Sequence, residues 1–218
     1  MQGSAFQLSG SRIFAKVIDF TGVRMYRAVF LDRDGTVSEE VGYVNHLDRF
    51  KVYPWAPEAI RRLNQAGLQV ILITNQAGIA HGYFPESLVH EVHQRLQAEL
   101  AFGGAAVDAI YYCPHHPEGR VEAYRIQCMC RKPGTGLIEK AALERYLDLR
   151  SSFVVGDRYQ DLQMGFTVGA RTILVLSGYG KGELLYQKDT WAQQPDHIAA
   201  DLSDAVDWIL DFRDDISS

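Results

Sequence analysis

Short apolar runs alternate with amphipathic stretches along most of the chain. The run at 68–75 (LQVILITN) is apolar at nearly every position, which is typical of a central parallel strand covered on both faces. The apolar runs predict strands at 27–32, 68–75, 107–114, 152–158 and 171–177. Helical spacing predicts helices at 56–67, 85–104, 136–147 and around 160–169, followed by a late strand and a closing helix within 196–212.

This alternation of strands and helices predicts an α/β fold, a Rossmann-like three-layer sandwich with a central, mostly parallel sheet. In such sheets a functional site lies beyond the carboxyl ends of the strands. Polar residues follow four of the predicted strands at that edge: Asp32 and Asp34, Thr74 to Gln76, Cys113 and His115, and Asp157 and Asp161. Helix and turn capping alone does not account for four such clusters.

Composition narrows the class of protein. The chain has 218 residues, 47% of them hydrophobic and 22% charged, as expected for a globular protein. A net charge of −5 and the lack of a Lys/Arg cluster argue against a nucleic-acid partner. No apolar run is long enough to span a membrane and no secretory signal is evident, so a cytoplasmic location is expected. We expect residues 1–24 to be an extension of a single domain at 25–218.

The segment AVFLDRDGTV (28–37) ends a buried strand with two carboxylates two residues apart. Asp32 and Asp34 would repel each other unless a cation lay between them. Together with Asp157 they offer the hard oxygen ligands that Mg²⁺ prefers. One carboxylate could attack a phosphorus atom and the other could move the proton. Thr74 and Lys132 are suited to stabilising the charge of a phosphoryl group in transfer.

Four motifs resemble those of the haloacid dehalogenase superfamily of phosphohydrolases: DRDGT (32–36), LITNQ (72–76), RKP (131–133) and GDRYQD (156–161). The resemblance implies that Asp32 is the nucleophile and Asp34 the general acid and base. It implies that Thr74 and Lys132 stabilise the phosphoryl group. Asp32, the backbone carbonyl of Asp34 and Asp157 would hold Mg²⁺, with Asp161 supporting that site from behind.

Longer stretches, including TNQAGIAHGYF (74–84), resemble one branch of that superfamily, the phosphatases of heptose bisphosphates and of histidinol phosphate. The first of these implies hydrolysis of the 7-phosphate of D-glycero-D-manno-heptose 1,7-bisphosphate in nucleotide-activated heptose biosynthesis. Histidinol phosphate or another small phosphomonoester is the alternative substrate. Implied substrate contacts are Glu40, Val41, Gly42, Tyr43, Asn75, Gln76, Ala77, Arg131 and Arg158. Arg158 departs from the lysine usual in the family, and a guanidinium is not equivalent to an ammonium.

All three cysteines lie between 113 and 130, spaced as Cys113-x-His115 and Cys128-x-Cys130. Three thiolates and one imidazole would make a closed, tetrahedral, structural zinc site, with His116 as a substitute ligand. No disulfide is expected from this odd, clustered set. The segment 113–130 would then form a zinc loop that ends directly before Arg131 and Lys132. With only short loops where a cap domain would be inserted, the family resemblance implies a minimal cap and a monomer.

Two functions of another class remain open at this stage. A phospho-accepting receiver also groups acids, Thr and Lys around an aspartate, although its phosphorylated aspartate lies on the third strand. A zinc-stabilised binding protein without catalysis is the other. Among the remaining histidines, His46 and His81 fall in the candidate substrate loops. His90 and His93, three apart on a predicted helix, are expected to face solvent.

Overall fold

The structure is a computed structural model, and it describes residues 16–18 and 24–216. Its main sheet has six parallel strands. In spatial order they are β5 (Ala109–Cys113), β4 (Gln69–Asn75), β3 (Ala28–Leu31), β6 (Phe153–Gly156), β7 (Arg171–Val175) and β8 (His197–Ala199). The chain builds outward from β3 to β5, then crosses back to place β6 on the other side of β3. The strand order therefore reverses beside β3, where parallel α/β sheets open a crevice for ligands.

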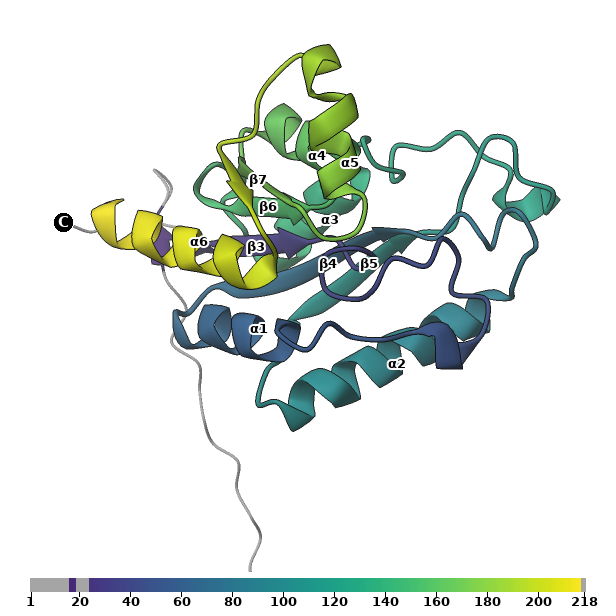
Figure 1. Cartoon of the computed structure of the whole chain (residues 1–218), viewed down its shortest axis with the longest axis horizontal. Coiled ribbons are helices and arrows are strands. Elements are labelled where there is room, and N and C mark those ends of the chain that lie inside the picture. Colours follow the sequence, from purple (N-terminus) through teal and green to yellow (C-terminus); the bar gives the residue numbers. More distant parts are fainter. Residues whose placement is uncertain (1–15, 19–23, 217–218) are drawn as a thin grey trace, which may run out of the picture.

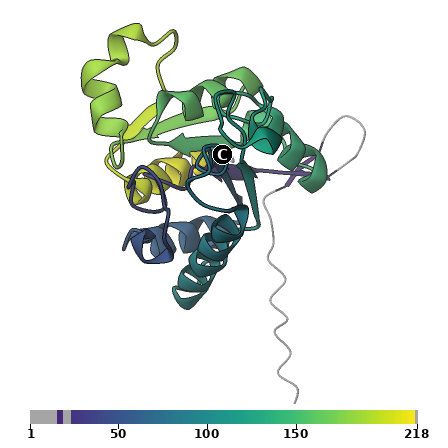
Figure 2. The same ribbon diagram turned by 90° about the vertical axis from the view of Figure 1, so that its right-hand side faces the viewer.

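Helices cover both faces of this sheet (Figures 1 and 2). The core on one face joins α1 (Ala56–Gln65), α2 (Glu86–Phe102) and α6 (Leu202–Ile216) to the sheet. The core on the other face joins α3 (Gly136–Arg145) and α4 (Tyr159–Val168) to it. The three-layer α/β architecture expected from the sequence is confirmed.

Strand β3 shows why both faces had to be apolar. Val29 and Leu31 pack into the core beside α1, whereas Ala28 and Phe30 pack into the core beside α3. All four side chains are buried. Because successive strand residues point to opposite faces, only an unbroken apolar run satisfies both layers.

The predicted strands and helices occur within about two residues of their expected ends, except that α6 runs to Ile216, four residues beyond the expected end at 212. Besides four short 3₁₀ helices, two features of the described residues were not predicted. A short helix, α5 (Gly180–Tyr186), follows β7, and an antiparallel hairpin joins β1 (Lys16–Ile18) to β2 (Arg24–Tyr26). The rest of the expected extension at 1–24 lies outside the described residues. In the part of the chain that the structure describes, no helix has the length and apolarity to cross a bilayer.

Candidate active site

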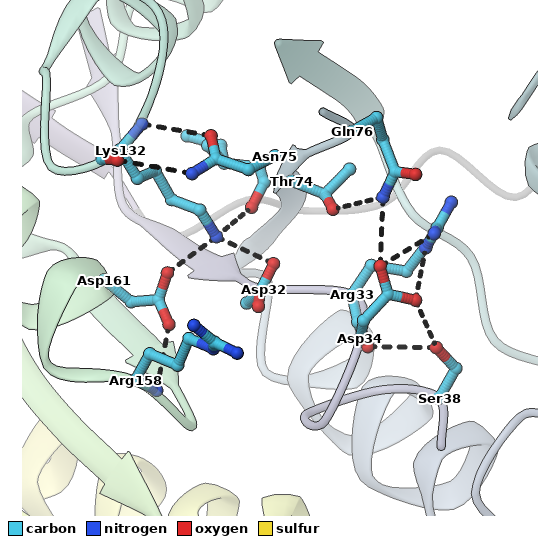
Figure 3. A network of polar contacts seen from close by, with 11 residues as sticks. Asp32, Arg33, Asp34, Ser38, Thr74, Asn75, Gln76, Lys132, Arg158 and Asp161 are labelled. Carbon is cyan, nitrogen blue, oxygen red and sulfur yellow. Dashed lines mark hydrogen bonds and ion pairs between the residues drawn. The ribbon is translucent and has the colours of Figure 1, made fainter. Parts of the chain in front are cut away.

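Asp32 lies directly after β3, and its backbone N–H donates to the carbonyl of Val155 on β6 at 3.0 Å. Lys132 approaches from the loop before α3 and is almost completely buried. Its Nζ lies 2.7 Å from Asp32 Oδ1 and 2.6 Å from Asp161 Oδ1, and it donates to the carbonyl of Ile73 at 2.9 Å (Figure 3). One ammonium therefore joins Asp32 after β3, Ile73 on β4 and Asp161 on α4.

The charges in this group are strongly perturbed. Burial raises the pKa of Asp32 to about 7, with Lys132 opposing the rise and Asp161 and Asp34 adding to it. Burial acts to lower the pKa of Lys132, but the carboxylates of Asp161 and Asp32 outweigh it and the pKa is raised. Lys132 is therefore a fixed cation at the floor of the site, as a phosphoryl group would require.

The carboxylate of Asp34 turns away from Asp32 (Figure 3). Arg33 donates two hydrogen bonds to it, from Nη2 to Oδ2 at 2.7 Å and from Nε to Oδ1 at 3.0 Å. The Gln76 amide nitrogen donates to Asp34 Oδ2 at 2.9 Å and to Thr74 Oγ1 at 3.0 Å. Gln76, expected as a substrate contact, thus links the candidate general acid to the hydroxyl of Thr74.

Arg33 was not singled out in the sequence, yet only 1% of it is exposed. Its Nη1 lies 3.3 Å from His93 Nε2 on α2, and its guanidinium lies 5.7 Å from the ring centroid of Phe50. The expectation that His93 faces solvent is wrong, because His93 is buried against this guanidinium. Burial, with Arg33 nearby, lowers the pKa of His93 to about 3. A neutral imidazole is thus favoured beside the cation.

Asp157 follows β6 and is fully buried. Its Oδ2 accepts a hydrogen bond from the backbone N–H of Tyr179 at 2.8 Å, whereas its Oδ1 is buried without a partner. Burial, reinforced by Asp32 and Asp161, raises its pKa to about 9. Glycines at 35 and 178 make room for it, since a side chain at either position would collide with the Asp157 carboxylate.

Carboxylate oxygens of Asp32, Asp157 and Asp161 lie within 4.8 Å of one another. Three acids this close, one with an unpartnered buried oxygen, fit a divalent cation with oxygen ligands. The Asp34 side chain lies outside the group, which leaves its backbone carbonyl as the ligand implied by the resemblance. Asp161 is engaged elsewhere, because its Oδ2 accepts from the backbone N–H of Arg158 at 3.1 Å.

The second predicted metal group also comes together. Cys113 Sγ, His115 Nδ1, Cys128 Sγ and Cys130 Sγ lie within 4.8 Å of one another. The sulfur atoms are 3.0 to 3.5 Å apart and no disulfide joins them. His116 points elsewhere, with its ring centroid 4.6 Å from that of His81. This donor set, three sulfurs and one imidazole nitrogen, is the kind that binds zinc.

A second set of contacts holds the zinc loop at 113–130, the segment that carries the Cys and His ligands. Glu86, at the start of α2, accepts the hydroxyl hydrogens of Tyr112 and Tyr124, each at 2.7 Å. These two bonds lower the pKa of Glu86. Tyr112 lies on β5 and Tyr124 lies between the two pairs of metal-ligand residues, so this Glu86 clamp ties the loop to the sheet and to α2.

A cavity of about 210 Å³ opens above Asp32. Most of the expected substrate contacts line it: Glu40, Gly42, Tyr43, Asn75, Gln76, Ala77, Arg131 and Arg158. Val41 instead lines a neighbouring hollow. The Asn75 side-chain amide also makes two hydrogen bonds to the backbone of Lys132. It accepts from the Lys132 N–H at 3.0 Å and donates to the Lys132 carbonyl at 3.3 Å. Val44, Gln160 and Tyr179 line the cavity without having been predicted.

A family model described as HAD-hydrolase-like matches residues 129–205. A Thermosynechococcus vestitus protein named D-glycero-D-manno-heptose-1,7-bisphosphate 7-phosphatase is 44% identical over 84% of this chain and 94% of its own length. A Salmonella typhi protein named D-glycero-beta-D-manno-heptose-1,7-bisphosphate 7-phosphatase is 34% identical over 88% of this chain and 93% of its own.

Among solved structures, a D,D-heptose 1,7-bisphosphate phosphatase from B. bronchiseptica, complexed with magnesium and phosphate, matches with a TM-score of 0.76. The two chains are 32% identical, and the match covers 85% of this chain and 99% of the other. The similarity thus extends over nearly the whole of these relatives.

Proposed function

Because the chain belongs to the D-glycero-D-manno-heptose-1,7-bisphosphate 7-phosphatase family of haloacid dehalogenase-like hydrolases, we propose that it removes the 7-phosphate of such a bisphosphate. The observation that carries this proposal is the floor of the cavity. There the buried Lys132 contacts the candidate nucleophile Asp32, and directly beneath lies the buried Asp157, with a carboxylate oxygen within 4.8 Å of one on Asp32. The family identity counts against a receiver or a non-catalytic binding protein.

In the first step, a carboxylate oxygen of Asp32 bonds to phosphorus as the bond from phosphorus to the sugar oxygen breaks. Asp34 gives a proton to that leaving oxygen. In the second step, Asp34 takes a proton from water, and the resulting hydroxide bonds to phosphorus. The phosphoaspartate bond breaks, which frees inorganic phosphate and restores Asp32. Lys132 and Thr74 stabilise the negative charge that spreads over the phosphoryl oxygens in both steps.

Mg²⁺ would be held by Asp32, the backbone carbonyl of Asp34 and Asp157, and would supply positive charge against the phosphate. Zn²⁺ would be held by Cys113, His115, Cys128 and Cys130. This closed site would have a mechanical role, fixing the loop that presents Arg131 and Lys132. We further propose that residues 25–218 form one phosphatase domain that acts as a monomer.

Phosphate release tests the function directly. The α and β anomers of D-glycero-D-manno-heptose 1,7-bisphosphate are assayed with Mg²⁺ beside histidinol phosphate, with Asp32→Asn as the blank. We expect a clear preference for one heptose bisphosphate, which also identifies the anomer. Preference for histidinol phosphate would be consistent with the proposed mechanism but would contradict the proposed substrate. Release that is equal in the Asp32→Asn variant would contradict the nucleophile.

A further inference from the structure

Arg158 and Tyr179 form a stacked pair at the wall of the cavity. The Arg158 guanidinium carbon lies 3.8 Å from the centroid of the Tyr179 ring, close enough for a strong cation–π contact. Both residues line the cavity above Asp32. Arg158 directly follows Asp157, and Figure 3 shows its side chain extending toward the middle of the site.

The backbone of Tyr179 is fixed by a hydrogen bond to Asp157. Its backbone N–H is the donor that holds Asp157 Oδ2 at 2.8 Å, and α5 begins at the next residue. Tyr179 therefore serves two neighbouring residues at once, Asp157 through its backbone and Arg158 through its ring. This arrangement places the guanidinium in a fixed relation to the candidate metal carboxylate.

A guanidinium that lies over an aromatic ring at 3.8 Å contacts the ring through its face, and its N–H edge can then bind another group. The N–H groups of arginine lie in the plane of the guanidinium, where they match two oxygens of a phosphate. In the described part of the chain, the Arg158 guanidinium makes no hydrogen bond. The acids that face it, Glu40 and Glu183, act on it only through their charge. Lys132, by contrast, is fully engaged by Asp32 and Asp161.

A bisphosphate brings a second phosphate that the floor of the site does not bind. Resting on the proposed function, we propose that Tyr179 is a positioning residue. Its ring holds Arg158 so that the free edge of the guanidinium receives the non-reacting phosphate of the substrate. Lysine, the usual family residue, would present a point charge without this fixed edge. Tyr179 and Arg158 thus determine how strongly this enzyme prefers bisphosphates to monophosphates.

The proposal is tested by comparing the KM for a bisphosphate with the KM for a monophosphate. Tyr179→Leu keeps the backbone N–H to Asp157 and removes the aromatic face. We expect the KM for the preferred heptose bisphosphate to rise about fivefold, the loss of one cation–π contact. The KM for p-nitrophenyl phosphate, which has no second phosphate, should change less than about twofold, and Tyr179→Phe should restore the KM of the bisphosphate. In an Arg158→Ala background, Tyr179→Leu should have no further effect.

Tyr186→Leu on the same helix is the matched control, because 85% of Tyr186 is exposed. An equal rise in KM for both substrates, or an additive effect of Tyr179→Leu in the Arg158→Ala background, would overturn the inference. So would an unchanged KM in Tyr179→Leu when the wild type hydrolyses the bisphosphate. A wild type that hydrolyses p-nitrophenyl phosphate but no heptose bisphosphate would refute the proposed function, and the inference with it.

Discussion

The guanidinium of Arg33 holds both carboxylate oxygens of Asp34 in a fork, at 2.7 and 3.0 Å. Arg33 is itself buried, so this pair fixes the rotamer of the candidate general acid from inside the protein. A residue between two acidic site residues is therefore part of the support of the site.

Arg33→Lys tests that support. Lysine keeps the charge but loses the two-pronged contact, so Asp34 should lose its defined orientation. We expect kcat to fall about tenfold, the equivalent of one charge-assisted hydrogen bond, with little change in KM. Steady-state phosphate release measures both. Arg61→Lys, on the exposed side of α1, is the control, and an unchanged kcat in Arg33→Lys would contradict the role.

His93 predicts how stability changes with pH. Burial, with Arg33 nearby, lowers its folded pKa to about 3, below the ordinary 6.5. Between these values the unfolded chain binds a proton that the folded chain does not, so stability falls as pH falls. Between pH 6.5 and 4.5, the free energy of unfolding should decrease by about 2 kcal/mol more in the wild type than in His93→Gln.

Urea unfolding at the two pH values measures this difference between variants. His90→Gln is the control, because His90 is exposed on the same helix. If His93→Gln showed the same pH dependence as the wild type, the buried neutral imidazole would be the wrong assignment.

Cys128→Ser tests the zinc loop. Loss of one thiolate should abolish stoichiometric zinc and loosen the chain leading to Arg131 and Lys132. We expect phosphatase activity to fall about tenfold or more, because small displacements of catalytic groups are costly, and added Mg²⁺ should not restore it. Met129→Ser, between the two cysteines and 72% exposed, should keep zinc and activity. Full activity in zinc-free Cys128→Ser would contradict the proposal that zinc fixes the loop that presents Arg131 and Lys132.

The Glu86 clamp predicts a change in metal retention. Glu86→Gln replaces a carboxylate that accepts two tyrosine hydroxyl hydrogens with an amide that accepts fewer. Zinc transfer to a chromogenic chelator should become about threefold to tenfold faster, reflecting about one weakened hydrogen bond. Glu91→Gln, exposed on the same helix, provides the comparison. Equal transfer rates in all three proteins would show that the clamp does not hold the loop.

Gly35 predicts a steric requirement of the metal site. Gly35 has φ +88°, and a side chain there would displace the Asp157 carboxylate. Gly35→Ala should lower activity about a hundredfold through this displacement. Gly104→Ala, at φ +71° but with only an ordinary contact to Arg61 Cδ at 3.5 Å, should cost about 1 kcal/mol of stability from the backbone alone and leave activity intact. Equal effects of the two substitutions would rule out the collision as the cause.

Much of the fold could be predicted because the strands of the main sheet are buried on both faces, and such strands are unbroken apolar runs. Helix α5 was missed because it has only seven residues, of which two are glycines. The hairpin of β1 and β2 has three residues per strand, too few to show a period.

The grouping of Asp32, Thr74 and Asp157 could be predicted because each lies at the carboxyl end of a strand at one edge of the sheet. Arg33 could not be, since its burial depends on His93, sixty residues further along the chain. His93 left a signal that was overlooked: it lies four residues after the buried Val89, on the apolar stripe of α2. The Arg158–Tyr179 pair joins two different strand ends and has no local signature.

The central position of β3 has a consequence for folding kinetics. The backbone N–H of Ala28 pairs with Ser152, 124 positions away, and Asp32 pairs with Val155. Such pairings raise contact order, and loop closure must precede them, so folding should be slow for a chain of this size. The acids of the floor meet only once β6 has docked on β3. A nascent chain that ends before β6 would carry Asp32 and Asp34 without a working centre.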